Sequence, residues 1–209
     1  MYAPDAFRVT EKALLLEVMR DYPFVLIVTG SDAGMVATSA PVVTLETPEG
    51  VVLRGHLARA NPHWRAMDGK TDSLVVFSGP NGYVSPGWYG TSPAVPTWNY
   101  VSVHATGRPV ARHDEEFVRS VMAELTGRYE GNRDRPWRLE DLPGEFRERL
   151  FDAIVGFEMP VARLEGKFKL SQNRSAEDRM GVIEGLEREG RAEAATLARF
   201  MRRHGVEGV

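Results

Sequence analysis

The chain has 209 residues, no cysteine and a formal net charge of -3 at pH 7, and 43% of its residues are hydrophobic. These values are typical of a soluble globular protein and exclude disordered and fibrous classes. Without cysteine, disulfides and thiolate metal sites are excluded. The slightly negative charge offers no general attraction for nucleic-acid phosphate, which lowers the expectation of a DNA-binding domain.

The first quarter of the chain predicts one helix followed by strands. Helical spacing of apolar residues predicts a helix over 10–21, which Pro23 ends. Segments rich in β-branched residues predict strands over 24–29, 35–45 and 51–57. The turn sequence at 47–50 joins the last two as an antiparallel hairpin. Asn61 and Pro62 have the cap-then-proline order of a short helical turn that runs to about residue 68.

The remainder alternates between strands and helices. Strand patterns occur at 74–77, 83–89 and 96–106, and β-type segments around Pro160 predict a last strand pair over 155–171. Helical spacing covers 114–129, 143–154 and 191–204. Ser175 with Asp178 three residues later has the order of a capping box that begins another helix.

These elements predict a mainly β fold with peripheral helices, an antiparallel barrel rather than a parallel α/β sheet. We expect a barrel domain over 1–175 with a helical insert near 114–154, and a C-terminal helical segment over 176–209. The longest aliphatic or aromatic run, 24–28, is too short to cross a membrane. The N-terminus lacks the pattern of a secretory signal, so a cytoplasmic location is expected.

A first group of candidate binding residues follows the hairpin. Strand alternation puts Arg54 and His56 on one face, and the strand leads into Arg59 and Asn61 at a helix start. A cation, an imidazole and free backbone N–H groups suit a phosphate. The alternative is that Arg54 lies on a solvated strand face and Asn61 only caps the helix.

Smaller signals come from two strands. Residues 36–42, including Thr38 and Ser39, are small or carry hydroxyls, and leave room for a flat ligand such as a flavin. Trp98, Tyr100 and His104 alternate onto one strand face. That face is either a stacking platform for an aromatic ligand or an ordinary packing surface.

The segment KFKLSQNRS contains two of the four lysines of the chain. In a strand, Lys167 and Lys169 share one face and Phe168 lies on the other. Gln172 adds an amide, so the stretch suits a phosphate or the heteroatoms of a flavin. A charged strand end that leads into a capped helix explains it equally well.

Several common motifs are absent from the sequence. There is no Gly-x-Ser-x-Gly, no Walker loop and no Gly-x-Gly-x-x-Gly after a strand. The five histidines do not have the spacing of metal ligands, so we predict no metal site.

Five blocks in order resemble the PaiB family: MYAPDAF at the start, GHLARANPHW, GPNGYVSPGWY, VPTWNYVSVHATG and KLSQNRSAEDR. The resemblance implies an FMN-binding split β-barrel, assembled as a homodimer with FMN at the subunit interface. It also implies that Arg59 and Asn61 hold the FMN phosphate and that Thr38 and Ser39 lie along the isoalloxazine edge. Lys167, Lys169 and Gln172 would complete the pocket, from either subunit.

The PaiB family is named for negative regulation of transcription, which implies regulation through DNA or through a protein partner. One alternative is an FMN-dependent reductase or oxidase that acts on a small substrate. Another is a haem-binding split barrel with His56, His63 or His104 as ligand. The sequence leaves these three functions open.

Overall fold

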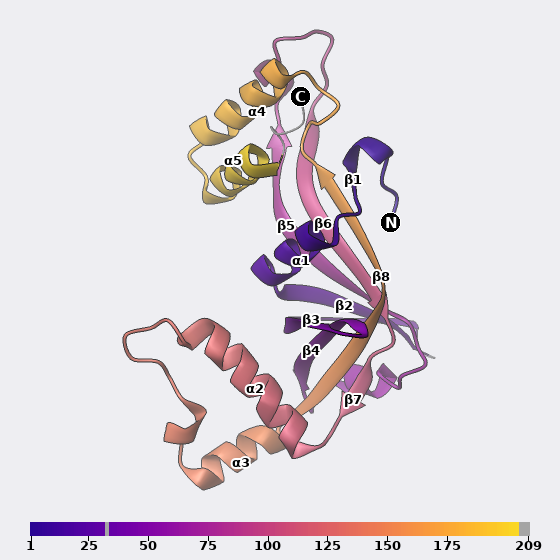
Figure 1. The fold of residues 1–209 in the computed structure, drawn as a ribbon, viewed down its shortest axis with the longest axis vertical. Helices are drawn as coiled ribbons and strands as arrows, with labels where there is room; N and C mark the ends of the chain where they lie inside the picture. Colours follow the sequence, from indigo (N-terminus) through magenta and orange to yellow (C-terminus); the bar gives the residue numbers. More distant parts are fainter. Residues whose placement is uncertain (32–33, 205–209) are drawn as a thin grey trace. The chain divides into compact units, whose positions relative to one another are not determined.

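The computed structural model describes residues 1–31 and 34–204, which form an antiparallel sheet with flanking helices (Figure 1). The strands are β1 (Arg8–Val9), β2 (Phe24–Ser31), β3 (Gly34–Thr47), β4 (Gly50–Ala58), β5 (Ser73–Val84), β6 (Thr97–Gly107), β7 (Val110–Arg112) and β8 (Ile154–Lys169). The α-helices are α1 (Lys12–Asp21), α2 (Glu115–Glu130), α3 (Gly144–Asp152), α4 (Ala176–Arg188) and α5 (Ala192–His204). Short 3-10 turns are η1 (Asp5–Phe7), η2 (Pro62–Ala66), η3 (Pro86–Trp88) and η4 (Leu139–Asp141).

The strand pairing closes the sheet. Its order is β1-β8-β4-β3-β2-β5-β6, with β7 beside β8, and an additional pairing connects β6, the last strand of this order, to β8, the second. Every register that the structure gives is antiparallel. The predicted mainly β, antiparallel barrel with helices is therefore confirmed.

The predicted hairpin is β3 and β4. Thr47 lies opposite Gly50, and Val42 lies opposite Gly55. Gly50 has a φ of 139°, a left-handed conformation that side chains with a Cβ rarely adopt. The turn sequence thus determines both the place and the register of the hairpin.

Two strand predictions differ from the structure. The expected strand pair over 155–171 is the single strand β8, which continues through Pro160. Pro160 is opposite Val52 at the end of the β4 pairing and is exposed, so its missing N–H leaves the ladder intact. The alternation at 83–89 is strand only in its first two residues, because β5 ends at Val84 and the turn η3 follows.

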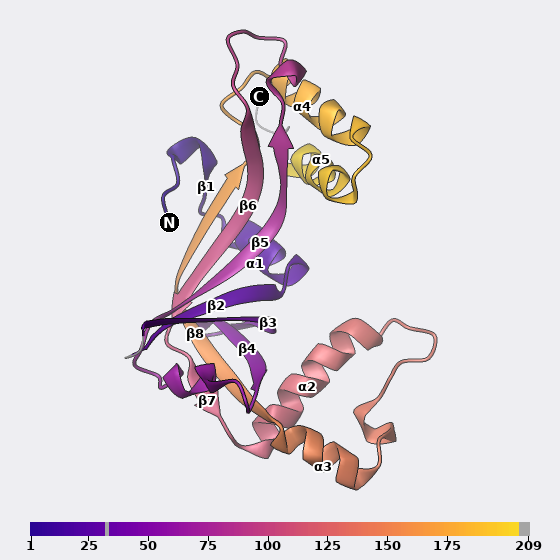
Figure 2. The same cartoon turned by 180° about the vertical axis from the view of Figure 1, so that it is seen from behind.

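The structure divides into two compact units, and the chain passes from one to the other within α1, β5, β6 and β8. The first unit comprises 1–18, 78–103 and the chain from 165 onward. Its helices α4 and α5 lie side by side, as Figure 2 shows from behind. Phe168 of β8 packs on Phe200 of α5, with ring centroids 5.5 Å apart. The expected boundary near residue 175 falls inside this unit.

The second unit comprises 19–77 and 104–164, and includes the expected helical insert as α2, η4 and α3. Helix α2 packs on β3 and β4. Val43 of β3 forms a buried cluster with Phe117, Val121 and Leu125 of α2. The apolar residues of α2 recur at helical spacing, which is why this helix buries one face.

The turn η3 packs closely against helix α4 at two glycines of the helix. A Cβ at Gly185 would lie 2.3 Å from the Trp88 ring, and a Cβ at Gly181 would lie 2.2 Å from the Trp88 carbonyl oxygen. The Asp178 carboxylate holds the following loop, because it accepts hydrogen bonds from the Gly90 N–H (2.8 Å) and the Thr91 hydroxyl (2.5 Å). The PGWYG segment is therefore fixed to α4.

We predict that Gly185→Ala destabilises the protein by roughly 1–3 kcal/mol, because the added methyl displaces the Trp88 ring. Gly127→Ala is the matched control: Gly127 lies in α2, and nothing lies within 4 Å of the position that an added methyl would take. There the gain in helix propensity should stabilise by about 0.5–1 kcal/mol. Urea unfolding measures both, and equal effects would contradict the packing argument.

Candidate functional site

The junction after β4 carries the first predicted pair, Arg59 and Asn61. The Arg59 backbone N–H donates to the Ala153 carbonyl (2.8 Å), and its guanidinium donates to the carbonyls of Asp152 (2.5 Å) and Ile154 (2.8 Å). These contacts anchor Arg59 where α3 leads into β8. Within residues 1–31 and 34–204 these contacts use two of its five N–H donors, which leaves three for a ligand.

The predicted cap at Asn61 is confirmed, although the helical turn is shorter than expected. The Asn61 Oδ1 accepts from the His63 backbone N–H (3.1 Å), and η2 spans only Pro62–Ala66. So short a turn provides a weak dipole. The anion-binding capacity at Asn61 therefore depends on its side chain, whose Nδ2 donates to the Thr38 hydroxyl (3.1 Å).

A chain of buried polar side chains continues inward from Asn61. His63 contacts the Thr38 hydroxyl through Nδ1 and the Thr29 hydroxyl through Nε2, both at 2.8 Å. The Thr29 and Ser73 hydroxyls are 2.6 Å apart. Burial lowers the pKa of His63 below its ordinary value of 6.5, because desolvation disfavours the imidazolium. His63 is therefore neutral at pH 7.

Sequence reasoning treated His63 as a haem-ligand candidate and missed Thr29 and Ser73. A signal was nevertheless present. Thr29 and Thr38 are hydroxyl residues on the inward face of β2 and β3, where their neighbours Ile27 and Ala40 are buried and apolar. Polar residues at inward strand positions need a partner.

Two cavities adjoin these residues. One of about 460 Å³ is lined by His63, Arg65, Asp68, Thr71 and residues of β2 and β3. The other, of about 390 Å³, has Arg59 at its wall together with His113 and three carboxylate residues, Glu115, Glu148 and Asp152. Those carboxylates oppose the approach of a phosphate, so the second cavity does not suit an anion.

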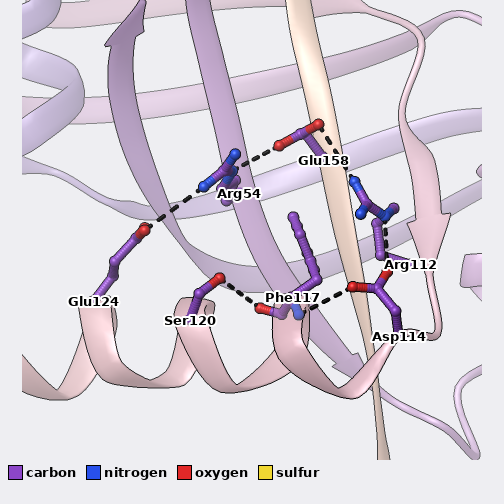
Figure 3. A network of polar contacts seen from close by, with 7 residues as sticks. All are labelled: Arg54, Arg112, Asp114, Phe117, Ser120, Glu124 and Glu158. Atoms are coloured by element: carbon purple, nitrogen blue, oxygen red, sulfur yellow. Dashed lines mark hydrogen bonds and ion pairs between the residues drawn. The ribbon is translucent and has the colours of Figure 1, made fainter.

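Arg54 and His56 share one strand face as predicted, but α2 lies over that face (Figure 3). The Arg54 Nε donates to Glu158 at 2.6 Å, and its Nη1 lies 3.7 Å from Glu124. Phe117 lies under the guanidiniums of Arg54 and Arg112, at 5.4 and 4.5 Å. This ion-pair network neutralises Arg54, so its proposed role in holding an anion gains no support.

His56 lies half-buried in the same region. Burial lowers its pKa, and its Nδ1 is buried without a hydrogen-bond partner in the described part of the chain. The lowered pKa keeps the imidazole neutral at pH 7, and the side chain as a whole is half-buried. The prediction that His56 binds a cofactor is likewise not supported by its surroundings.

Thr38 and Ser39 face opposite sides of β3. The Thr38 side chain is turned toward Asn61 and His63, and Ser39 is exposed opposite Leu26 of β2. Strand alternation makes this separation unavoidable. Their side chains therefore cannot both line the same edge of a flavin.

The predicted residues of the first unit lie on an aromatic strand face. Lys167 Nζ lies 5.4 Å from the ring centroid of Tyr2 and 5.2 Å from that of Tyr100. Trp98 is 54% exposed and contacts Tyr83 edge to face. Exposed aromatic rings with a cation among them form a surface that a planar anionic ligand can contact.

Lys169 and Gln172 have local partners. Lys169 donates to the Thr97 hydroxyl and to the Trp98 carbonyl (2.8 Å), and burial, with the charge of Lys167, lowers its pKa. The Gln172 amide binds backbone groups of Phe168 (2.5 Å) and Leu170 (2.7 Å). Gln172 thus shapes the turn after β8. Phe168 lies on the opposite, buried side, as predicted.

The capping box is confirmed in part. The Ser175 hydroxyl accepts from the Asp178 backbone N–H at 3.1 Å. The Asp178 carboxylate binds the Gly90 and Thr91 loop instead of the Ser175 backbone. Its sequence position alone did not indicate this second role.

Among residues 1–31 and 34–204, no group of three or more His, Asp or Glu side chains is arranged to hold a metal ion. No helix in these ranges combines the length and the apolar character needed to cross a bilayer.

Residues 1–163 match the family model described as "Putative FMN-binding domain". The chain belongs to this family. It is also 34% identical, over 96% of both chains, to the Bacillus subtilis protein named protease synthase and sporulation protein PAI 2. An uncharacterised protein of Emericella nidulans is 30% identical over 98% of both chains. The expected PaiB family and the FMN cofactor are thereby confirmed.

Solved structures share the fold at low sequence identity. The flavocytochrome Anf3 of Azotobacter vinelandii superposes with a TM-score of 0.61 and 13% identity, over 78% of this chain and 69% of that one. An FAD and haem binding protein of Mycobacterium smegmatis has the same TM-score and 16% identity, over 83% and 78%. The expected flavin-binding split-barrel class is confirmed.

We predict that the unfolding free energy decreases as the pH falls below 6.5, because the unfolded chain then binds a proton at His63 more readily than the folded chain does. His63→Gln removes this contribution, so its stability should depend less steeply on pH between 7 and 5. Urea unfolding at several pH values measures the two slopes. Parallel curves would contradict a depressed pKa at His63.

Proposed function

We propose that the chain is a cytoplasmic, homodimeric FMN-binding protein of the PaiB type, and that it acts in negative regulation of transcription. The observation that carries the proposal is the match of residues 1–163 to the FMN-binding family, together with 34% identity to the Bacillus subtilis sporulation protein. When bound, FMN supplies electron-transfer chemistry. The chain itself supplies the binding groups.

The second unit has donors for the phosphate. Arg59 keeps three N–H donors beyond its contacts with Asp152 and Ile154, and Asn61 keeps one amide hydrogen beyond its bond to Thr38. The acidic cavity beside Arg59 does not fit a phosphate. We therefore infer that the phosphate lies on the Asn61 side of Arg59.

The first unit has groups for the flavin ring. Trp98 and Tyr100 expose aromatic surface on β6, and Lys167 lies over the Tyr100 ring. In a homodimer these groups can come from either subunit. Their chemistry fits a planar, electron-poor ring with hydrogen-bond acceptors.

We predict that FMN binds the purified protein and that Arg59→Ala and Lys167→Ala each weaken binding about tenfold, because each removes a charged donor. A titration followed by flavin fluorescence measures the affinity. Arg188→Ala is the control, since Arg188 is exposed on α4 and its ion-pair partner among the described residues is Glu184. Binding that neither substitution weakens would reject these residues.

The dimer is supported by an apolar strand surface. Phe24 and Leu26 of β2 and Met35 of β3 are 68%, 42% and 73% exposed, and alternation places them on one sheet face. Exposed apolar patches of this kind mark interfaces. A second copy of the chain is the proposed occupant.

We predict that Leu26→Asp converts the dimer to a monomer, because a carboxylate would be buried in the interface. Sedimentation velocity measures the change. Leu150→Asp on α3 is the matched control, since Leu150 is 40% exposed and lies on the helical insert. A wild-type monomer would reject the dimer.

The other functions make different predictions in the same preparation. An FMN-dependent oxidoreductase should oxidise a nicotinamide cofactor when FMN is present. A haem protein, as the two similar structures are by name, should show a Soret band on haem addition. A regulator that binds DNA directly should shift a specific operator fragment at physiological salt.

A further inference from the structure

Four buried or half-buried polar side chains form an unbranched row in the second unit. Thr38 contacts His63 Nδ1, His63 Nε2 contacts Thr29, and Thr29 contacts Ser73, at 2.8, 2.8 and 2.6 Å. Asn61 joins the outer end through Thr38. The row runs from Thr38 of β3, which is partly exposed, to Ser73 of β5, which is 1% exposed.

The direction of the outermost bond follows from the backbone. The His63 N–H can only donate, so the Asn61 atom that it contacts is the amide oxygen. The Asn61 Nδ2 is then the atom beside the Thr38 hydroxyl, and it donates. Thr38 cannot return its own hydrogen to Asn61.

The number of hydrogens restricts the rest of the row. Thr38, neutral His63, Thr29 and Ser73 each carry one polar hydrogen, whereas three contacts join them. One hydrogen is therefore left over, and it must point outward from one end of the row. Either Thr38 or Ser73 carries it, and all three bonds have opposite directions in the two arrangements.

The two ends differ in their access to an acceptor. Ser73 is 1% exposed, and Thr29 is its hydrogen-bond partner among residues 1–31 and 34–204. A surplus hydrogen there would be buried without an acceptor, which is strongly disfavoured. Thr38 is partly exposed, so its surplus hydrogen can meet water or a ligand.

We infer that neutral His63 carries its hydrogen on Nδ1 and so holds the Thr38 hydroxyl as an outward donor beside the spare amide hydrogen of Asn61. His63 is then a positioning residue. Two adjacent donors select a ligand oxygen that only accepts, such as a phosphate or carbonyl oxygen. This inference rests on the proposed function in naming FMN as the source of that oxygen.

The protonation of His63 agrees with this arrangement. An imidazolium would add a fifth hydrogen and force Thr29 to donate to Ser73, which would leave the surplus at the buried end. Burial already lowers the pKa of His63. Both effects keep the imidazole neutral, and the hydrogen count then assigns its tautomer.

The tautomer is measured by two-bond ¹H–¹⁵N NMR of the full chain labelled at histidine, at pH 7, with the His63 signals identified by their loss in His63→Gln. We expect hydrogen on Nδ1 in the wild type. Ser73→Ala should give the same result. Without Ser73, the surplus hydrogen belongs either to the buried Thr29 or to the partly exposed Thr38, and only Thr38 can direct it to water or a ligand. Hydrogen on Nε2, or on both nitrogens, would overturn the inference.

Binding tests the donor at Thr38. Thr38→Val should weaken FMN binding about tenfold, and Thr38→Ser should retain it within about twofold, as expected for one hydrogen bond to a charged oxygen. Riboflavin, which lacks the phosphate, separates the sources: an equal loss for riboflavin assigns the acceptor to the ring, and no loss assigns it to the phosphate. Thermal melts confirm that both variants fold.

The outcomes of the two experiments are distinct. FMN binding that Thr38→Val leaves unchanged would overturn the inferred donor while the proposed function stands. A wild-type protein that does not bind FMN would reject the proposed function, and the NMR result would still decide the order of hydrogens in the row.

Discussion

The rest of the structure depends on the continuous pairing of strand β8. Its residues pair with β1, β4, β6 and β7, so four strands depend on it. Its first residue, Ile154, accepts a hydrogen bond from the Arg59 guanidinium, Glu158 binds Arg54, and Lys167 lies near its end. Successive side chains of a strand point to opposite faces of the sheet. The register of β8 therefore decides which of its side chains are accessible to a ligand.

The basic residues of this chain illustrate how tertiary contacts select among apparent binding groups. Arg54 is neutralised by Glu158 and Glu124 beneath α2, and Lys169 is engaged by Thr97 and Trp98. Arg59 retains donors, but one side of it faces carboxylates. A charged side chain that is already paired stabilises the fold. It adds little to the affinity for a ligand, because the ligand must first displace the existing partner.

Buried polar groups carry the other constraint. His63, Thr29 and Ser73 are buried, and each needs a partner with the correct hydrogen. Their row reaches Asn61, where the site for the cofactor phosphate is proposed. These hydrogen bonds therefore connect the buried Ser73 to Asn61 through Thr29, His63 and Thr38.

The sequence by itself determined the local features. The hairpin at 47–50, the cap at Asn61, the helices of the insert and the opposite faces of Lys167 and Phe168 follow from turn residues, capping and periodicity, which act over a few residues. Five sequence blocks also indicated the family and its cofactor. Only the tertiary structure decided that β8 is one strand, that α2 covers Arg54 and His56, and that Thr38 meets His63. Those outcomes depend on contacts between residues far apart in the chain, and no local pattern encodes them.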